Sequence, residues 1–290
     1  MKKSMMLRAI ETVTKVANVR KMWDTEGEAL RKSILKKQQK VALPTKLEKK
    51  YAVSKYEVGE HSFFEITPAK KTSQTIIYLA GGGFVLPITS LHYEFIAQIV
   101  EETGARLVVP NYPLAPYYHV DDVMAFLKGV YLKYADGHVS LVGDSAGGAI
   151  AMSFVQFLKQ EKLTFPQKVV GISPFMNFCL DNPAIYEVEK RDNVVGTTAL
   201  REIRSWYANG RDYTDSLVSP FFGDYTGISE ILLVSSTRDI TNPDTHLFAE
   251  KGLPNLTYYE AGELPHIYPL FEIPEAAEAR ELIFSFLKRS

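Results

Sequence analysis

The feature that most constrains this chain is the pentapeptide Gly-Asp-Ser-Ala-Gly at residues 143–147, because of what flanks it. Residues 138–142 are mostly β-branched or apolar and predict a short strand, whereas residues 148–158 predict a helix with small side chains in its first turn. Gly-x-Ser-x-Gly between a strand and a helix is typical of a nucleophile elbow, a tight turn that exposes the serine hydroxyl at the C-terminal edge of a sheet. The pattern therefore indicates Ser145 as a nucleophile, against the alternative of a plain glycine-rich turn.

The rest of the chain alternates strand and helix patterns. Strands are expected over residues 51–58, 61–66, 75–79, 106–109, 168–172, 231–235 and 256–260. Helices are expected over residues 92–103, 120–134, 198–208, 244–251 and about 274–288. This alternation predicts an α/β fold with a mostly parallel, doubly wound sheet flanked by helices, and 290 residues suit a single domain of this class.

Composition excludes several other classes of protein. With 46% hydrophobic residues the chain can bury a large core, and its net charge of −1 argues against nucleic acid as a partner. The single cysteine, Cys179, excludes an intrachain disulfide and fits a reducing compartment. No apolar run is long enough to span a membrane, and Arg8 and Glu11 interrupt the first apolar stretch, which argues against a secretory signal. We expect a cytoplasmic protein that needs no cofactor or metal.

Charge is concentrated at the N-terminus. Residues 1–50 contain 14 Lys and Arg against 5 Asp and Glu, a net charge of +9, so the remainder carries −10. The first 40 residues predict helix, with Gly27 as a break. We favour a basic amphipathic helical pair packed on an acidic body; the alternative is a surface that contacts anionic membranes or substrates.

Three consecutive glycines follow the strand expected over residues 75–79. Glycine loses more conformational entropy on folding than other residues, so such a run indicates a turn that needs bare, closely approaching backbone. We predict that the N–H groups of Gly82 and Gly83, together with that of Ala146, form an oxyanion hole. A merely flexible turn is the alternative, but flexibility does not require a buried strand before it.

A general base is sought among six histidines. Four of them start expected strands or lie on expected helices and are interpreted as structural, namely His61, His92, His138 and His246, and His119 is left undecided. His266 lies in the loop between the last strand and the last helix, where an elbow-type hydrolase carries its histidine. We therefore assign the base to His266.

The carboxylate that orients the base is expected after the strand over residues 231–235. Asp239 follows this strand, and the order Ser145, Asp239, His266 is the order that nucleophile-elbow enzymes use. Asp244 is the rival in the same loop, but it immediately precedes an expected helix, so we predict that it is an N-cap.

Together these motifs make the chain similar to the hormone-sensitive-lipase-like branch of the α/β hydrolases, over about residues 75–271. The corresponding segments are the glycine run before Phe84, Tyr-Pro-Leu-Ala-Pro at residues 112–116, residues 143–148, Ser173-Pro174-Phe175, Ser219-Pro220, and Asp239 ahead of Pro243-Asp244. The resemblance implies a serine esterase for short or medium acyl esters. It also implies a helical cap from residues 1–50 plus about 181–225, over a core from residues 51–180 plus 226–290.

The chain departs from that branch at two positions. Ala80 stands where the branch usually has a histidine before the glycines, and Asn177 stands where an aspartate is common. By resemblance the missing histidine braces the oxyanion turn and transfers no proton, so the departure affects how firmly the turn is held. Two alternatives to an esterase stay open: a non-catalytic small-molecule-binding protein on the same scaffold, and an amidase or peptidase.

Overall fold

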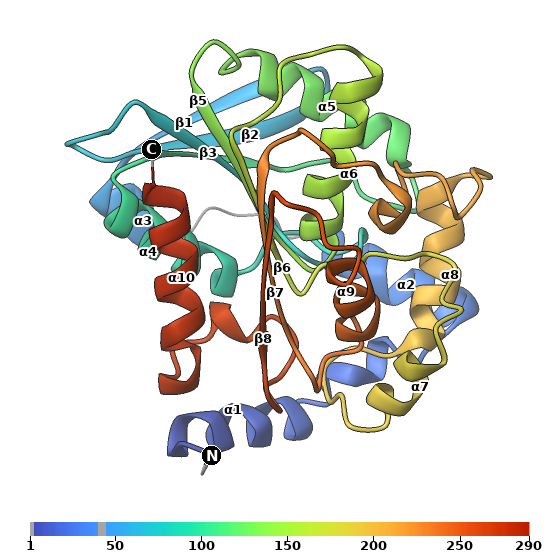
Figure 1. The fold of residues 1–290 in the computed structure, drawn as a ribbon. Coiled ribbons are helices and arrows are strands. Elements are labelled where there is room, and N and C mark those ends of the chain that lie inside the picture. Colours follow the sequence, from blue (N-terminus) through green and yellow to red (C-terminus); the bar gives the residue numbers. More distant parts are fainter. Residues whose placement is uncertain (1–2, 40–44, 290) are drawn as a thin grey trace.

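The computed structural model describes residues 3–39 and 45–289, and an eight-stranded sheet forms its centre (Figure 1). The strands are β1 (Ala52–Val58), β2 (His61–Thr67), β3 (Gln74–Leu79), β4 (Arg106–Pro110), β5 (His138–Asp144), β6 (Lys168–Ile172), β7 (Glu230–Ser236) and β8 (Leu256–Ala261). They lie in the order β1-β2-β4-β3-β5-β6-β7-β8. The β1–β2 and β2–β4 pairs are antiparallel and the other neighbours are parallel, which confirms the predicted sheet.

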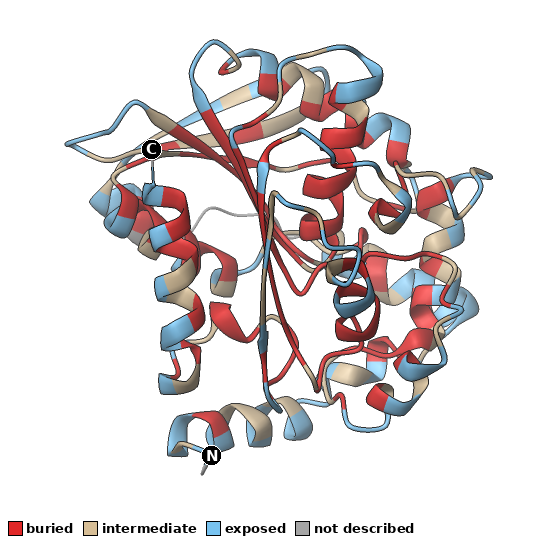
Figure 2. Cartoon of the chain, in the orientation of Figure 1, coloured by how far each residue is buried: buried red, intermediate tan, exposed pale blue. Residues whose placement is uncertain are grey.

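Helices cover both faces of the sheet. One face carries α3 (Thr45–Lys50), α4 (Ser90–Thr103) and α10 (Ala277–Lys288), and the other carries α5 (Val120–Leu132), α6 (Ala146–Gln160) and α9 (Asn242–Ala249). Every residue of β6 and all but the first of β5 are buried. Strands that are covered on both faces are mainly apolar, and Figure 2 shows the central strands buried along most of their length.

Four further helices complete the described fold: α1 (Met5–Val16), α2 (Gly27–Gln38), α7 (Pro183–Glu189) and α8 (Thr197–Ala208). Figure 1 shows α2, α7 and α8 on the same side of the molecule. Segments far apart in sequence are joined here, since Arg20 donates to the carbonyl oxygen of Glu189 at 2.6 Å and Ala199 donates its N–H to the carbonyl oxygen of Trp23 at 2.9 Å. None of the described helices combines the length and apolar character that a membrane crossing requires.

The expected elements are present, with shifted ends. The helix after the pentapeptide begins at Ala146 rather than at 148, because the chain enters it directly from the turn. The short helix α7 has no expected counterpart; Asn182 caps it, accepting from Ala184 N–H at 3.1 Å. The N-terminal helix pair is present, but the break between α1 and α2 spans residues 17–26. Residues 1–2 and 40–44 of the expected N-terminal segment lie outside the described residues.

Candidate active site

Ser145 lies in the turn between β5 and α6. Its backbone has φ 51° and ψ −121°, a strained left-handed conformation for a residue with a side chain. The turn is possible because glycines flank it: a Cβ atom on Gly147 would collide with the carbonyl oxygen of Leu79 in β3. The N–H of Ser145 donates to the carbonyl oxygen of Ile172 at 2.8 Å. The sharp turn thus fixes the hydroxyl at the C-terminal edge of the parallel strands.

The structure brings the three predicted side chains into one hydrogen-bonded row. His266 Nε2 lies 2.8 Å from Ser145 Oγ, and His266 Nδ1 lies 2.9 Å from Asp239 Oδ1. The N–H and hydroxyl of Thr241 also donate to Asp239 Oδ1, both at 2.9 Å. Asp239 is fully buried and His266 is 3% exposed. With Nδ1–H donating to the carboxylate, the network assigns Nε2 as the acceptor of the serine proton.

The electrostatics of the row keep Asp239 ionised. Burial by itself lowers the pKa of His266, but the charge and hydrogen bond of Asp239, helped by Asp192 and Asp144, raise it above its usual value. Burial has the opposite effect on Asp239 and raises its pKa. The charge and hydrogen bond of His266, with hydrogen bonds from Ser173 and Thr241, outweigh burial and hold the pKa of Asp239 below its usual range. The carboxylate is thus a fixed negative charge that favours imidazolium.

Asp192 is a second carboxylate beside this row, and it was not among the residues predicted from the sequence. It is 2% exposed and accepts backbone N–H groups from Val194 at 2.7 Å, Val195 at 3.1 Å and Ile240 at 3.1 Å. Burial and then the charge of Asp239 raise the pKa of Asp192. The carboxylate ties residues 192–195 to the loop that carries Asp239. No sequence signal predicts a bond between residues this far apart.

Asp244 does not lie in this row, and the prediction that it caps a helix is wrong. It is the third residue of α9, whose N-cap position is Thr241. Its Oδ1 accepts from the side-chain amide of Asn182 at 2.9 Å, and the residue is 4% exposed. Burial raises its pKa to about 6, with a contribution from nearby Asp181.

The three glycines form the turn opposite Ser145. Gly82 has φ 143° and Gly83 has φ 58°, backbone conformations that side chains rarely adopt. The indole of Trp23 packs against Gly83 where a Cβ atom would stand. Within the described residues, no backbone hydrogen bond engages the N–H of either glycine. Ala146 begins α6, so its N–H has no acceptor within the helix.

His92, interpreted as structural, braces this turn through Asp144. His92 Nε2 lies 3.2 Å from Asp144 Oδ2, and the hydroxyl of Tyr78 donates to Asp144 Oδ1 at 2.7 Å. Burial raises the pKa of Asp144, but His92, Tyr78 and the Gly81 N–H outweigh burial and lower it. Ala80 is 4% exposed, and its carbonyl oxygen accepts from Tyr112 at 2.6 Å. The turn is therefore held from both sides without a histidine at position 80.

The other four histidines have their contacts outside the row. His61 packs edge-on against Tyr118 and Phe126, His119 contacts the carbonyl oxygen of Trp206, His138 contacts Gln167, and His246 contacts Glu260. Asn177 is likewise peripheral: it accepts from Cys179 N–H and donates to Asp181.

A mainly apolar cavity of about 320 Å³ opens over Ser145. The glycine turn and His266 form its floor, and Phe84, Phe175 and Phe271 are among its apolar lining. The N-terminal segment and the segment after α7 also contribute to its walls, through Thr14, Val19, Trp23, Val194, Val195 and Leu200. An apolar cavity with few convergent polar groups is typical of a small-molecule site.

A family model described as alpha/beta hydrolase fold matches residues 76–261, more than half of the chain. The chain belongs to the α/β-hydrolase family. The sequence motifs predicted a resemblance to the hormone-sensitive-lipase-like branch, and hormone-sensitive-lipase homologues are among the structural neighbours of this hydrolase.

Three comparisons are specific. The hydrolase is 26% identical over 241 residues to an acetyl-hydrolase from Streptomyces hygroscopicus, covering 80% of this chain and 81% of the relative. The crystal structure of a candidate esterase from Staphylococcus aureus matches it with a TM-score of 0.86 and 26% identity, over 94% and 96% of the two chains. EstE7, a hormone-sensitive-lipase homologue from a metagenome library, matches with a TM-score of 0.80 and 20% identity, over 99% and 98%.

The hydrolase should gain stability at neutral pH when Asp244 is replaced by asparagine. An aspartate pKa is about 3.9 in an unfolded chain, and the buried carboxyl of Asp244 has a pKa of about 6. The folded state therefore favours the protonated carboxyl, and ionising it destabilises the fold as pH rises from about 4 through 6. Asparagine keeps an oxygen acceptor for Asn182 and carries no charge.

Urea unfolding at pH 4, 6 and 8 measures this effect. We expect the stability of Asp244→Asn, relative to the parent protein, to increase by roughly 2–3 kcal/mol between pH 4 and 8. Asp136→Asn, at an exposed aspartate, should show no such increase. A stability difference that does not change with pH would contradict the burial of a titrating Asp244.

Proposed function

We propose that this hydrolase is a serine esterase that cleaves carboxylic esters with short or medium acyl groups. The observation that carries the proposal is the buried row Ser145–His266–Asp239, with distances of 2.8 Å and 2.9 Å. A serine hydroxyl is a weak nucleophile by itself and needs an adjacent base, which in turn needs a group that orients it. The row supplies each of these parts within hydrogen-bond reach.

In the proposed mechanism Ser145 attacks the ester carbonyl while His266 Nε2 takes the hydroxyl proton. Asp239 holds the imidazole in the required tautomer and stabilises the imidazolium that forms. His266 then protonates the leaving alcohol oxygen, which leaves an acyl-enzyme. A water molecule, deprotonated by His266 in its turn, attacks the acyl carbon and releases the acid and the free serine.

The carbonyl oxygen becomes negative as the tetrahedral intermediate forms. We assign its stabilisation to the N–H groups of Gly82, Gly83 and Ala146, which line the cavity beside Ser145. One well-placed donor contributes on the order of 3 kcal/mol to such a transition state, provided that it is fixed before the charge appears. The packing of Trp23 on Gly83 and the His92–Asp144 contact supply this fixation in our proposal.

The substrate class follows from the walls of the cavity. We propose that residues 1–50 and about 181–225 form a cap over a core from residues 51–180 and 226–290. The contacts of Arg20 and Trp23 with residues 189–199 support a cap of two joined segments. The cavity volume of about 320 Å³ and its apolar lining suit a short or medium acyl chain. The acetyl-hydrolase relative supports the same range.

Replacing the serine tests the function most directly. Wild-type protein should hydrolyse p-nitrophenyl acetate and butyrate, and Ser145→Ala should lower the rate by ~10⁴–10⁶-fold because no nucleophile remains. A panel of acyl lengths, with an anilide of the same acyl group, separates an esterase from an amidase. A wild type without turnover or labelling by a fluorophosphonate would favour the non-catalytic binding protein.

Asp239 and Asp244, which both follow β7, provide a matched pair of variants. Asp239→Asn should reduce kcat by ~10⁴-fold, since the amide favours the wrong imidazole tautomer. Asp244→Asn, equally buried and equally conservative, should leave kcat within about twofold of the wild-type value because Asp244 contacts Asn182 and not His266. Loss of turnover in Asp244→Asn with a normal Asp239→Asn would exchange the two assignments.

The pH–rate profile should report the raised pKa of His266. Only neutral imidazole accepts the serine proton, so kcat/KM should fall as pH drops through this pKa. Because Asp239 raises the pKa, the midpoint of the fall should lie above the ordinary histidine value of about 6.5. Circular dichroism over the same range checks that the protein stays folded. A flat profile between pH 5 and 8 would exclude histidine base catalysis.

His92 should act on kcat rather than on substrate binding. Its removal frees Asp144, and with it the Gly81 end of the oxyanion turn, so donors lose their alignment. We expect His92→Ala to lower kcat by up to ~10²-fold, with KM changed less than about threefold, and His92→Gln to restore part of the loss. Equal losses in His92→Ala and His92→Gln that follow their melting temperatures would show a purely structural role.

A further inference from the structure

The N-terminal helix carries an unusual concentration of exposed apolar side chains. Among the described residues, five of the nine large hydrophobic side chains that are strongly exposed lie between residues 5 and 19. They are Met5 at 87% exposure, Met6 at 52%, Val13 at 64%, Val16 at 82% and Val19 at 41%. Single exposed apolar residues are normal on a protein surface, but a cluster marks an interaction site.

The first four of these side chains, those of Met5, Met6, Val13 and Val16, share one side of α1. At 3.6 residues per turn, Met5, Ala9, Val13 and Val16 follow one another along the helix, and Met6 lies beside them. We call these five residues the apolar face. Leu7, the one fully buried side chain of α1, points the other way. Arg8 and Lys15 are exposed and lie along one border of the apolar face.

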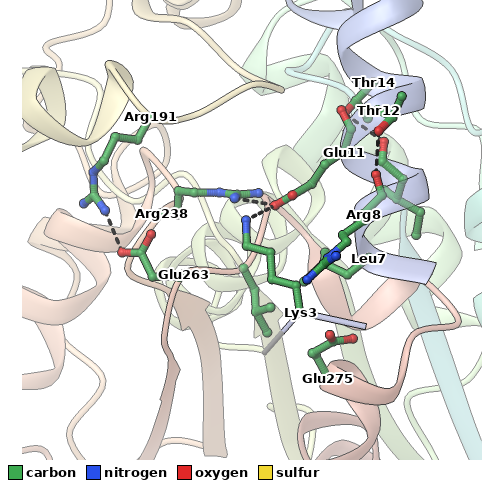
Figure 3. Close-up of polar contacts among 12 residues, drawn as sticks. Lys3, Leu7, Arg8, Glu11, Thr12, Thr14, Arg191, Arg238, Glu263 and Glu275 are labelled. Atoms are coloured by element: carbon green, nitrogen blue, oxygen red, sulfur yellow. Dashed lines mark hydrogen bonds and ion pairs between the residues drawn. The ribbon is translucent and has the colours of Figure 1, made fainter. Parts of the chain in front are cut away.

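Polar contacts hold α1 in this orientation, as Figure 3 shows. Glu11 forms ion pairs with Arg238, which follows β7, and with Lys3, which precedes α1. It is the only acidic residue of the described helix α1. Ser4 donates through its N–H and its hydroxyl to the carboxylate of Glu275, at 2.6 Å and 2.9 Å. Because Glu11 and Ser4 anchor the side of α1 that is opposite the apolar face, the apolar face cannot turn toward the core.

The N-terminal segment that carries the apolar face also borders the active-site cavity. Thr14, on α1 itself, and Val19, just after it, both line that cavity. Thr14 is on the side of α1 opposite the apolar face, whereas Val19, at 41% exposure, is both a surface residue and part of the cavity lining. Basic residues at this border attract an anionic surface and would repel one another across a symmetric contact with a second copy.

We propose that the apolar face of α1 docks in the plane of an anionic lipid surface. Helices of this type bury an apolar side at the level of the lipid headgroups while basic side chains contact anionic groups. Arg8, Lys15 and Lys21 are the exposed basic residues available here. The docking itself is independent of catalysis. Its consequence rests on the proposed function: docking then brings the esterase to esters that partition into lipid.

Vesicle co-sedimentation of the full-length protein tests the docking. Vesicles of 30% phosphatidylglycerol in phosphatidylcholine are compared with pure phosphatidylcholine, at low and at 0.5 M salt. We expect binding to the anionic vesicles that salt weakens. The double variant Val13→Ser, Val16→Ser should bind about tenfold more weakly, and Arg8→Gln, Lys15→Gln should lose the preference for anionic vesicles. The matched control Leu132→Ser, Leu247→Ser removes two exposed side chains elsewhere and should bind like wild type.

The outcomes separate the docking from the proposed reaction. Ser145→Ala should bind vesicles normally, and Val13→Ser, Val16→Ser should hydrolyse dissolved p-nitrophenyl butyrate normally while losing rate on vesicle-borne ester. Absence of binding by wild type, or equal binding by the valine variant and its control, would overturn the proposal. A wild-type dimer that the valine variant converts to a monomer would instead assign the apolar face to a second copy of the chain.

Discussion

The close approach of α6 to β3 is the constraint on which the rest of the site depends. A bare backbone at Gly147 lets the helix start directly against the carbonyl oxygen of Leu79, where no side chain fits. This contact brings the strained Ser145 and the glycine turn after β3 to the same place, although they lie more than 60 residues apart in the sequence. Packing at van der Waals distance leaves little freedom to either, so the geometry around the hydroxyl is set by the backbone before any side chain contributes.

Buried carboxylates surround this rigid centre, and each has a different partner. Asp239 faces His266, Asp144 faces His92 and Tyr78, and Asp192 accepts three backbone N–H groups. A buried negative charge is costly unless such partners compensate it. The charges of all three act on His266 in the same direction, so its basicity reflects the whole arrangement and not one neighbour.

The sequence predicted those features that arise from local patterns. Strand and helix periodicities gave the order of the elements, and the positions of Asp239 and His266 after successive strands placed them at one edge of the sheet, where the structure has them 2.9 Å apart. It could not predict the role of Asp192, because one of the N–H groups that donate to it belongs to a loop 48 residues away. Asp244 was misassigned because the start of α9, two residues earlier than expected, turns a cap position into an interior one. The bracing of the glycine turn by His92 was missed for the same reason as Asp192: the contact is tertiary.

The contacts of the N-terminal segment also bear on the order in which the protein can fold. The partners of this segment lie far along the sequence. Arg20 bonds to residue 189, Trp23 to residue 199 and Glu11 to residue 238. Ser4 bonds to Glu275. Contacts of such sequence separation form late, because a long loop must close first. Until these contacts form, Leu7 is exposed together with the apolar side chains of α1, and such transiently exposed apolar surface favours aggregation. The residue whose indole supports Gly83 is itself bonded to Ala199, which follows it by 176 residues in the sequence.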